Sequence, residues 1–143
     1  MTTAEQLTQV FYNNFVAYYR SHAAHVNVTG RNFRSDHKLL GGVYERRQAE
    51  IDKIAEILRT MDEFMPTSIV DVCENSTIPT DAIEGTADQM LESVMMDLEH
   101  LLSDFKELIS IAADEGVEEV SNYAQDQALD IEKSIWMLRS TLG

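Results

Sequence analysis

Four residues in the first half of the chain have side chains that could bind a metal ion, namely His25, His37, Asp52 and Glu56. Asp52 and Glu56 are four positions apart, so on a helix their carboxylates share one face. Imidazole nitrogen combined with carboxylate oxygen suits iron and other first-row transition metals. Taken singly, however, a histidine is more often a hydrogen-bonded structural residue, and a pair of acids more often faces solvent.

The distance between the histidines and the acids excludes a site within one chain. Fifteen positions separate His37 from Asp52, which at ~1.5 Å per residue is roughly 22 Å along a single helix. The four side chains can meet only if the two histidines come from one subunit and the two acids from another. An antiparallel two-fold pairing of the second helices would achieve this and would create two identical sites per dimer.

The elements that must position these residues are helical. Apolar residues recur at steps of three and four from Leu7 to Tyr19 and in three later stretches, and no segment alternates apolar and polar residues as a half-buried strand would. We expect the first helix to end in a turn at 27–32, and Ser35 or Asp36 to cap the second helix. The second helix is expected to stop before Pro66.

A long connection is expected in the middle of the chain, at residues 62–85, with a short apolar piece from Ser68 to Val72 that suits a short helix. Thr86 or Thr80 is expected to cap the third helix, and Gly116 to end it. Two helical hairpins joined by a long crossover are typical of ferritin-like bundles, although cytokine-like and other bundles also use long connections. The pattern therefore predicts an all-α fold, a ferritin-like four-helix bundle.

Composition narrows the class of protein. A chain of 143 residues suffices for a single domain, 1–143. The 25 acidic and 11 basic residues give a net charge of −14, which opposes binding to nucleic acid and would attract cations. No apolar stretch approaches the ~20 residues that span a bilayer, and the N-terminus lacks a signal-peptide pattern. Because the single cysteine, Cys73, also fits a reducing compartment, we expect a cytoplasmic protein that does not contact membranes.

A longer motif connects these observations to a known family. The run from His25 to His37, which reads His-Val-Asn-Val-Thr-Gly-Arg-Asn-Phe-Arg-Ser-Asp-His, resembles the signature of the Dps family, the mini-ferritins named for DNA protection during starvation. The pattern continues in register at Tyr44, Asp52, Ala55 and Glu56. Residues 132–138, Glu-Lys-Ser-Ile-Trp-Met-Leu, look like the closing helix of the family. The similarity spans nearly the whole chain, and its two separate motifs are in the correct order.

The resemblance implies a dodecameric homo-oligomer, a hollow shell of four-helix subunits with di-iron ferroxidase sites at the two-fold interfaces. The metal ligands, which are also the catalytic residues, would be two histidines of one subunit and two acids of its partner: His25, His37, Asp52 and Glu56. Fe(II) bound there would be oxidised by hydrogen peroxide, or by oxygen, and the ferric product would be stored inside the shell. The resemblance therefore implies a ferroxidase that stores iron.

Two positions depart from the family pattern. Many members carry an acid four positions after the second histidine, where this chain has Gly41, so one carboxylate ligand is missing and the iron site is weakened. Asp36 points about 100° away from His37 on a helix and does not replace that ligand. Tryptophan normally follows the first histidine, and this chain has Val26 instead. Tyr44 could supply an aromatic ring in its place, although a packed core tyrosine is the simpler interpretation.

The acidic residues around the junction of the third and fourth helices have two interpretations. They are Asp114, Glu115, Glu118 and Glu119. By resemblance, this region lines three-fold pores, where repeated acids would focus the electrostatic field on entering ferrous ions. A solvated turn with acids near the start of a helix explains the same residues equally well.

Two alternative functions remain open at this stage. The first is a Dps-like structural or DNA-associated shell protein whose ferroxidase site is weakened at Gly41. Residues 1–19 contain no Lys or Arg, and the chain ends at Gly143 without a basic extension, so DNA condensation is not expected. The second alternative is a monomeric or dimeric helical bundle that binds some other partner, which the size of the oligomer would distinguish from a shell.

Overall fold

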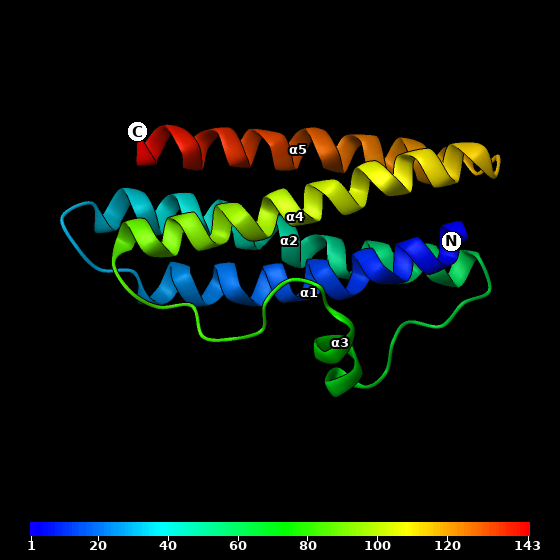
Figure 1. The fold of residues 1–143 in the computed structure, drawn as a ribbon, viewed down its shortest axis with the longest axis horizontal. Coiled ribbons are helices and arrows are strands. Elements are labelled where there is room, and N and C mark those ends of the chain that lie inside the picture. Colours follow the sequence, from blue (N-terminus) through cyan, green and yellow to red (C-terminus); the bar gives the residue numbers. More distant parts are fainter.

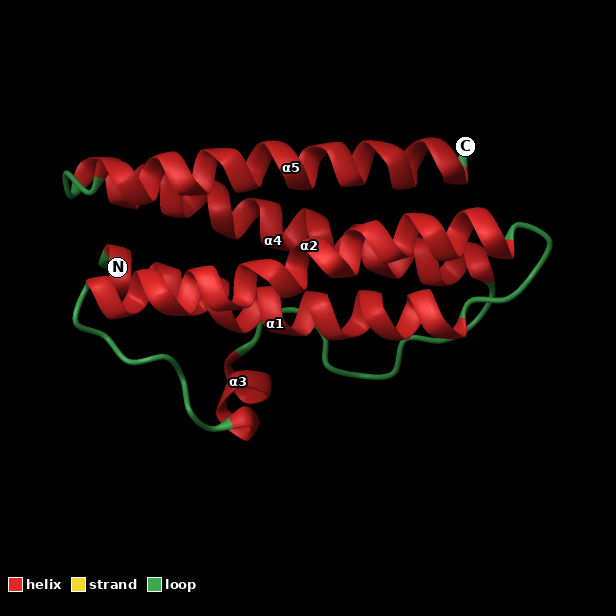
Figure 2. Cartoon of the chain, turned by 180° about the vertical axis from the view of Figure 1, so that it is seen from behind, coloured by secondary structure: helices red, strands yellow, loops and turns green.

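The computed structural model describes residues 1–143 as a bundle of four long helices with a fifth, short helix in the central connection (Figures 1 and 2). In chain order the helices are α1 (Thr3–Asn27), α2 (Phe33–Thr60), α3 (Ile69–Asn75), α4 (Ala87–Asp114) and α5 (Glu118–Leu142). The chain contains no strand, so the expectation of an all-α bundle with a short helix in the crossover is confirmed. None of the helices combines the length and the hydropathy needed to cross a membrane.

The bundle consists of two helical hairpins. α1 packs along α2, α4 packs along α5, and α1 also packs along α4, whereas α5 contacts α2 only lightly. One core of 27 buried hydrophobic residues joins the four long helices, with Leu7, Leu58, Leu98 and Leu138 among its fully buried members. Each such side chain contributes about 1.5–3 kcal/mol by leaving water. This shared core holds the α1–α2 hairpin in a fixed position relative to the rest of the bundle.

The helix ends agree with the sequence in part. Thr86 caps α4 in a complete capping box, in which Gln89 N–H donates to the Thr86 hydroxyl and Thr86 N–H donates to the Gln89 side chain. The expected caps of α2 were wrong, because the helix already begins at Phe33 with no side-chain cap. The Ser35 hydroxyl instead donates to the carbonyl of Asn32.

The capping box gives the first prediction. We expect Thr86→Ala to lower the free energy of unfolding by about 1 kcal/mol, because the amide of Gln89 loses its acceptor at the start of α4. Thr80→Ala is the matched control, since Thr80 is exposed and its side chain makes no hydrogen bond. Urea denaturation of both variants measures the difference. An equal, near-zero loss in the two would show that the box does not stabilise α4.

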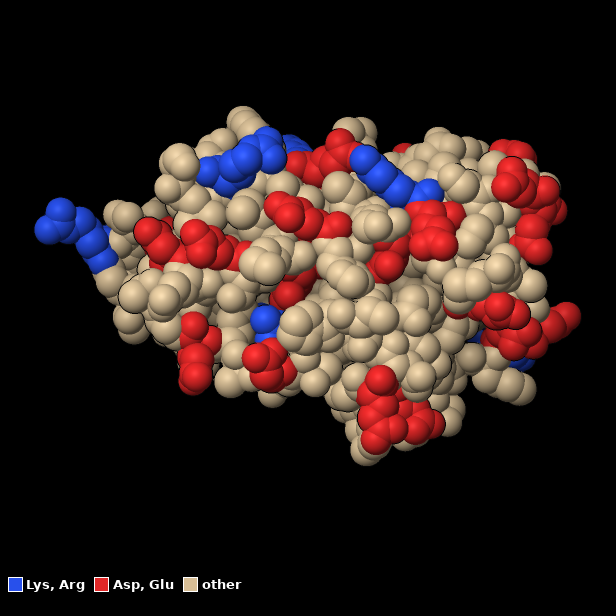
Figure 3. Space-filling model, viewed as in Figure 1, with Lys and Arg blue, Asp and Glu red and all other residues tan.

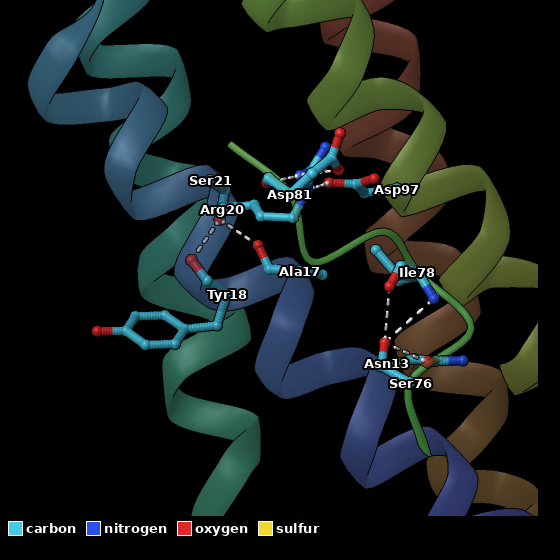
Figure 4. Close-up of polar contacts among 9 residues, drawn as sticks. All are labelled: Asn13, Ala17, Tyr18, Arg20, Ser21, Ser76, Ile78, Asp81 and Asp97. Atoms are coloured by element: carbon cyan, nitrogen blue, oxygen red, sulfur yellow. Dashed lines mark hydrogen bonds and ion pairs between the residues drawn. The ribbon is translucent and has the colours of Figure 1, made fainter. Parts of the chain in front are cut away.

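Polar side chains of α1 fasten the crossover to the bundle (Figure 4). The carbonyl oxygen of the buried Asn13 side chain accepts hydrogen bonds from the Ser76 hydroxyl and the Thr77 amide. Two turns further along α1, the Arg20 guanidinium donates to the carboxylate of Asp97 on α4, at 2.7 Å, and to the backbone carbonyl of Asp81, at 2.6 Å. These contacts hold α3 against α1 although its own buried apolar surface is small.

Two opposing effects act on the pKa of the Asp97 carboxyl. Its burial raises the pKa of the carboxyl, and the hydrogen bond and positive charge of Arg20 oppose that rise. Arg20 and Asp97 are both buried, so removal of either side chain would leave the charge of the other unpaired in the protein interior.

A second buried polar cluster lies inside the bundle and centres on Arg47 of α2, which is only 2% exposed. Its guanidinium donates to the side-chain oxygens of Asn14 at 3.2 Å, Gln127 at 3.1 Å and Asp130 at 3.2 Å. Burial lowers the pKa of Arg47, and the carboxylates of Asp130 and Glu50 oppose that effect. The guanidinium therefore connects three helices through one side chain: α1, α2 and α5.

Candidate metal centre

His25 and His37 lie together where α1 ends and α2 begins. Their rings stack with centroids 3.8 Å apart and planes 16° from parallel. The Nδ1–H of His25 donates to the backbone carbonyl of His37 at 2.6 Å, and the Nδ1–H of His37 donates to the carbonyl of His25 at 2.7 Å. The structure thus brings the two predicted histidines into one reciprocal pair.

The reciprocal bonds determine which nitrogen of each ring can bind a metal ion. A carbonyl oxygen only accepts hydrogen bonds, so each Nδ1 must carry a proton. In the neutral imidazole the lone pair then remains on Nε2, and hydrogen bonding at the other nitrogen is the arrangement that orients histidine ligands in metal sites. The pair can therefore present two Nε2 atoms, one from each half-buried ring.

Gly41 makes room for this pair. It lies on α2 one turn after His37, and a β-carbon at this position would stand 3.0 Å from Cε1 and 3.1 Å from Nδ1 of His25. Those distances are tighter than almost all contacts of a real β-carbon. The His25 ring therefore lies directly against the α2 backbone, and any other residue at this position would require the ring to shift by a few tenths of an ångström.

Three more rings extend the pair into a continuous aromatic cluster. Tyr44 stacks on His25 with centroids 4.9 Å apart, and the ring of His22 meets Tyr44 edge-on at 3.9 Å. The Tyr18 hydroxyl and Nδ1 of His22 are hydrogen bonded at 3.0 Å. Sequence reasoning had not included Tyr18 and His22, although their spacing of four and three positions from each other and from His25 puts all three on one face of α1.

The two predicted acids lie far from the histidines. Asp52 and Glu56 are exposed on the second half of α2, and neither makes an ion pair or a hydrogen bond within the chain; Lys53, between them, pairs with Glu50 instead. No group of three or more His, Cys, Asp or Glu side chains in the single chain is placed to hold a metal ion. The chain thus carries two half-sets of candidate ligands at separate places: the histidines lie where α1 ends and α2 begins, and the acids lie on the second half of α2.

Asp36 does not join the histidines. Its side chain is buried on the side of α2 that packs inward, with only 3% of its surface exposed. Burial raises the pKa of its carboxyl, and the nearby charge of Asp88 raises it further. The helical geometry that argued against Asp36 as a replacement ligand for the missing acid is thus confirmed.

One of the four acids at the junction of α4 and α5 has a structural role. The Glu115 carboxylate accepts hydrogen bonds from the hydroxyl and the amide of Thr3, which starts α1. These bonds lower the pKa of Glu115 and keep it ionised. Glu118 and Glu119 lie in the first turn of α5, where acids are favoured by the helix dipole. The pore interpretation of this cluster stays a prediction.

Acidic side chains are spread over the face of the molecule that contains α1, α3 and α4 rather than gathered in one patch (Figure 3). Few Lys and Arg side chains interrupt them, and one projects at the end of the bundle where α1 turns into α2. This distribution agrees with the net charge of −14. A surface of this kind attracts cations and offers little to a polyanion.

Comparisons with a family model, with protein sequences and with solved structures all point to ferritin-like proteins. The model of the ferritin-like domain family matches residues 4–143. The chain is 27% identical, over the full length of both proteins, to the DNA protection during starvation protein of Helicobacter pylori. Its fold matches Dps from Listeria innocua with a TM-score of 0.95 and 25% identity, covering 100% of this chain and 95% of that one. It also matches a Dps protein from Vibrio cholerae described as a ferritin-like diiron-carboxylate protein, with a TM-score of 0.93, 23% identity and coverage of 99% and 89%.

Proposed function

Since the chain belongs to the Dps family of ferritin-like proteins, we propose that it is a mini-ferritin with ferroxidase activity. It binds Fe(II) at sites between subunits, oxidises it with hydrogen peroxide or oxygen, and stores the ferric product in a hollow shell, which in this family is a dodecamer. The ligands are His25 and His37 of one subunit with Asp52 and Glu56 of its two-fold partner. The shell acts in the cytoplasm, the compartment that an unpaired Cys73 suits.

The reciprocal histidine pair carries this proposal. Each imidazole is held by the backbone carbonyl of the other histidine, and both Nε2 atoms are left for a ligand. Histidines that merely face solvent do not need to be fixed in this way. No further hydrogen-bond partner within the chain explains why the two rings are held in this arrangement. Metal ligation uses this geometry, because a fixed tautomer and ring orientation raise the affinity for the ion.

The separation of the half-sets supports the location of the site between subunits. Asp52 and Glu56 share one exposed face of α2 without a counter-charge, about four to five turns beyond His37. An antiparallel two-fold contact along α2 brings the acids of each chain to the histidines of the other.

The crossover side of the subunit also offers apolar surface for association. Tyr19, Ile69 and Val70 are 65%, 66% and 59% exposed, and they lie on or beside α3. Tyr19 and Ile69 line a cavity of about 330 Å³ together with Cys73. Exposed apolar side chains gathered in this way are typical of surfaces that bind another protein chain.

Each part of the site has a distinct task in the reaction. The partner's carboxylates balance the charge of the bound Fe(II), and the imidazoles complete the ligand set while leaving a coordination position for the oxidant. Each Fe(II) loses one electron and hydrogen peroxide takes up two, so two ferrous ions and two protons are consumed for every peroxide reduced to two waters.

The test is anaerobic loading with Fe(II) followed by peroxide, with the ferric absorbance in the near ultraviolet as the readout. We expect the wild-type protein to oxidise iron rapidly into a soluble ferric core, and the His37→Ala, Asp52→Ala variant to lose the rapid phase. Equal, slow oxidation in both proteins would contradict the proposal. In that case the protein would be a shell whose four candidate ligands do not act in iron oxidation.

The adjacent Gly41 and Gly42 of α2 allow a prediction with a matched control. We expect Gly41→Ala to weaken binding of Zn(II) at the site by about 10-fold, because the new methyl group displaces the His25 ring from its hydrogen bond. Gly42→Ala should leave the affinity unchanged and stabilise α2 by about 0.5–1 kcal/mol, since its β-carbon would meet only the flexible end of Arg46 at 3.4 Å. Calorimetric titration and urea denaturation measure the two effects. Unchanged affinity in Gly41→Ala would mean that the position of His25 does not matter for binding.

A further inference from the structure

A groove between α2 and α5 takes no part in the proposed iron chemistry. The two helices contact each other only lightly, and α5 leaves the rest of the bundle toward its C-terminal end (Figures 1 and 2). Between the first turns of α2 and the last turns of α5 lies a cavity of about 490 Å³. Pockets that bind small organic molecules have volumes of this order.

The walls of this α2–α5 groove are largely apolar. α2 contributes Leu39 and Val43, and α5 contributes Trp136 and Met137. Trp136 is 54% exposed and Met137 is 37% exposed, so the groove leaves two large apolar side chains in contact with water. Covering them with the apolar body of a ligand is favourable, because that surface then leaves water.

Two nearly buried polar side chains open onto the groove, one from each helix. Asp36 of α2 is 3% exposed and Ser134 of α5 is 6% exposed, and both line the cavity. Neither side chain makes a hydrogen bond or an ion pair within the chain. Since no fully buried side-chain oxygen or nitrogen of the protein lacks a partner, the oxygens of Asp36 and Ser134 must be reached from the groove. Such oxygens have lost most of their water and gain from a donor on a ligand.

The charges around the groove favour a cation at its inner end. No Lys or Arg pairs with Asp36, and the nearby charge of Asp88 makes the potential there more negative. Of the two basic residues at the groove, Arg46 is already paired with Asp130 at 3.3 Å, and Lys38 is exposed. The nearly buried carboxylate outweighs the solvated ammonium of Lys38, because electrostatic interactions are stronger where water is excluded.

We propose that the α2–α5 groove binds a small organic cation, namely a primary ammonium group on a compact apolar or aromatic body. The ammonium has three N–H groups, which donate to the carboxylate of Asp36 and the hydroxyl of Ser134. The body packs against Val43 and Trp136, and the indole face adds its own attraction for the positive charge. This site goes beyond the proposed function and does not depend on it.

Binding of 2-phenylethylamine to the assembled, iron-free protein tests the inference at physiological salt, which screens loose attraction to the acidic surface. Trp136 is the single tryptophan of the chain, so its fluorescence reports occupancy of the groove, and isothermal titration calorimetry measures the affinity. Two compounds of similar shape separate charge from apolar contact: 2-phenylethanol is neutral, and 3-phenylpropanoate is negative. We expect saturable binding of the amine in clear preference to both.

The variant Asp36→Asn should weaken binding of the amine about 10-fold or more, because the charged hydrogen-bond acceptor is lost. Ser134→Ala should weaken it several-fold, which provides a second test if Asp36→Asn does not fold. Asp71→Asn is the matched control, since it removes the same charge from an exposed position on α3 and should leave the affinity unchanged. Circular dichroism and size-exclusion chromatography establish folding and assembly.

Three results would overturn the proposal. The first is no change in Trp136 fluorescence and no heat at millimolar amine. The second is equal binding of the amine and 2-phenylethanol, which would make the groove a purely apolar surface. The third is an equal effect of Asp36→Asn and Asp71→Asn, which would show that the amine follows only the net charge of the protein.

Discussion

Two inactive variants are expected to restore activity when they are mixed. The first variant, His25→Ala with His37→Ala, keeps its acids. The second, Asp52→Ala with Glu56→Ala, keeps its histidines. Each alone should oxidise Fe(II) about 100-fold or more slowly than the wild type, since losing even an outer-shell partner of a metal site commonly costs ~10–100-fold. Dissociated, mixed and reassembled, they should recover about a quarter of the wild-type rate.

The expected recovery follows from the symmetry of a two-fold contact. Half of the randomly formed pairs contain one chain of each kind, and in such a pair one of the two sites combines intact histidines with intact acids. The other site of the same pair has neither. About one site in four is therefore complete.

The controls for this experiment are each variant taken alone through the same dissociation and reassembly. Native mass spectrometry counts the mixed pairs. Mixed pairs that remain inactive would show that the histidines and the acids do not meet across an interface. A variant that is fully active by itself would show that the residues it lacks take no part in the reaction.

The replacement Arg47→Met is expected to have the largest effect on stability, a loss of about 3–5 kcal/mol. Methionine keeps an unbranched, flexible side chain that replaces the aliphatic part of arginine, but it removes the charge and all the donors. The side-chain oxygens of Asn14, Gln127 and Asp130 then lose their shared partner, and the buried Glu50 loses a neighbouring positive charge. At roughly 2–4 °C per kcal/mol for a chain of this size, the melting temperature should fall by about 10 °C.

Arg46→Met is the matched control, because Arg46 pairs with the same carboxylate of Asp130, at 3.3 Å, but is 46% exposed. An exposed pair of this kind contributes less than about 1 kcal/mol. Differential scanning calorimetry compares the two variants. Similar losses in both would show that the burial of Arg47 is not what makes its contacts important.

The helices and the separation of the candidate ligands could be predicted from the sequence because both depend on spacing. Apolar residues at steps of three and four mark the buried face of each helix, and the rise of ~1.5 Å per residue already separates His37 from Asp52. The capping role of Thr86 followed from the preference of threonine for that position, and the structure confirms it over Thr80.

The features that could not be predicted depend on contacts between distant segments. The resemblance to the Dps family identified Gly41 only as a missing acid, whereas the structure shows that it makes room for the His25 ring. Arg47 stands four positions after Val43 and four before Ile51, on the buried stripe of α2. It could have been flagged from that spacing, but charged residues are so rarely buried that the polar cluster around it was not expected.

The division of the bundle into two hairpins has a consequence for the order of folding. All four candidate ligands lie between positions 25 and 56, within helices that are neighbours along the chain and pack on each other. Contacts between neighbouring segments close small loops and form early, while the packing of α1 on α4 must wait for the long crossover to close. On the proposed function, the histidine pair is thus assembled by one of the first units to fold, and the site is completed by the last event, the meeting of two finished subunits. A nascent or unassembled chain then carries both half-sets but no complete site, so iron oxidation does not start before the product has a shell to enter.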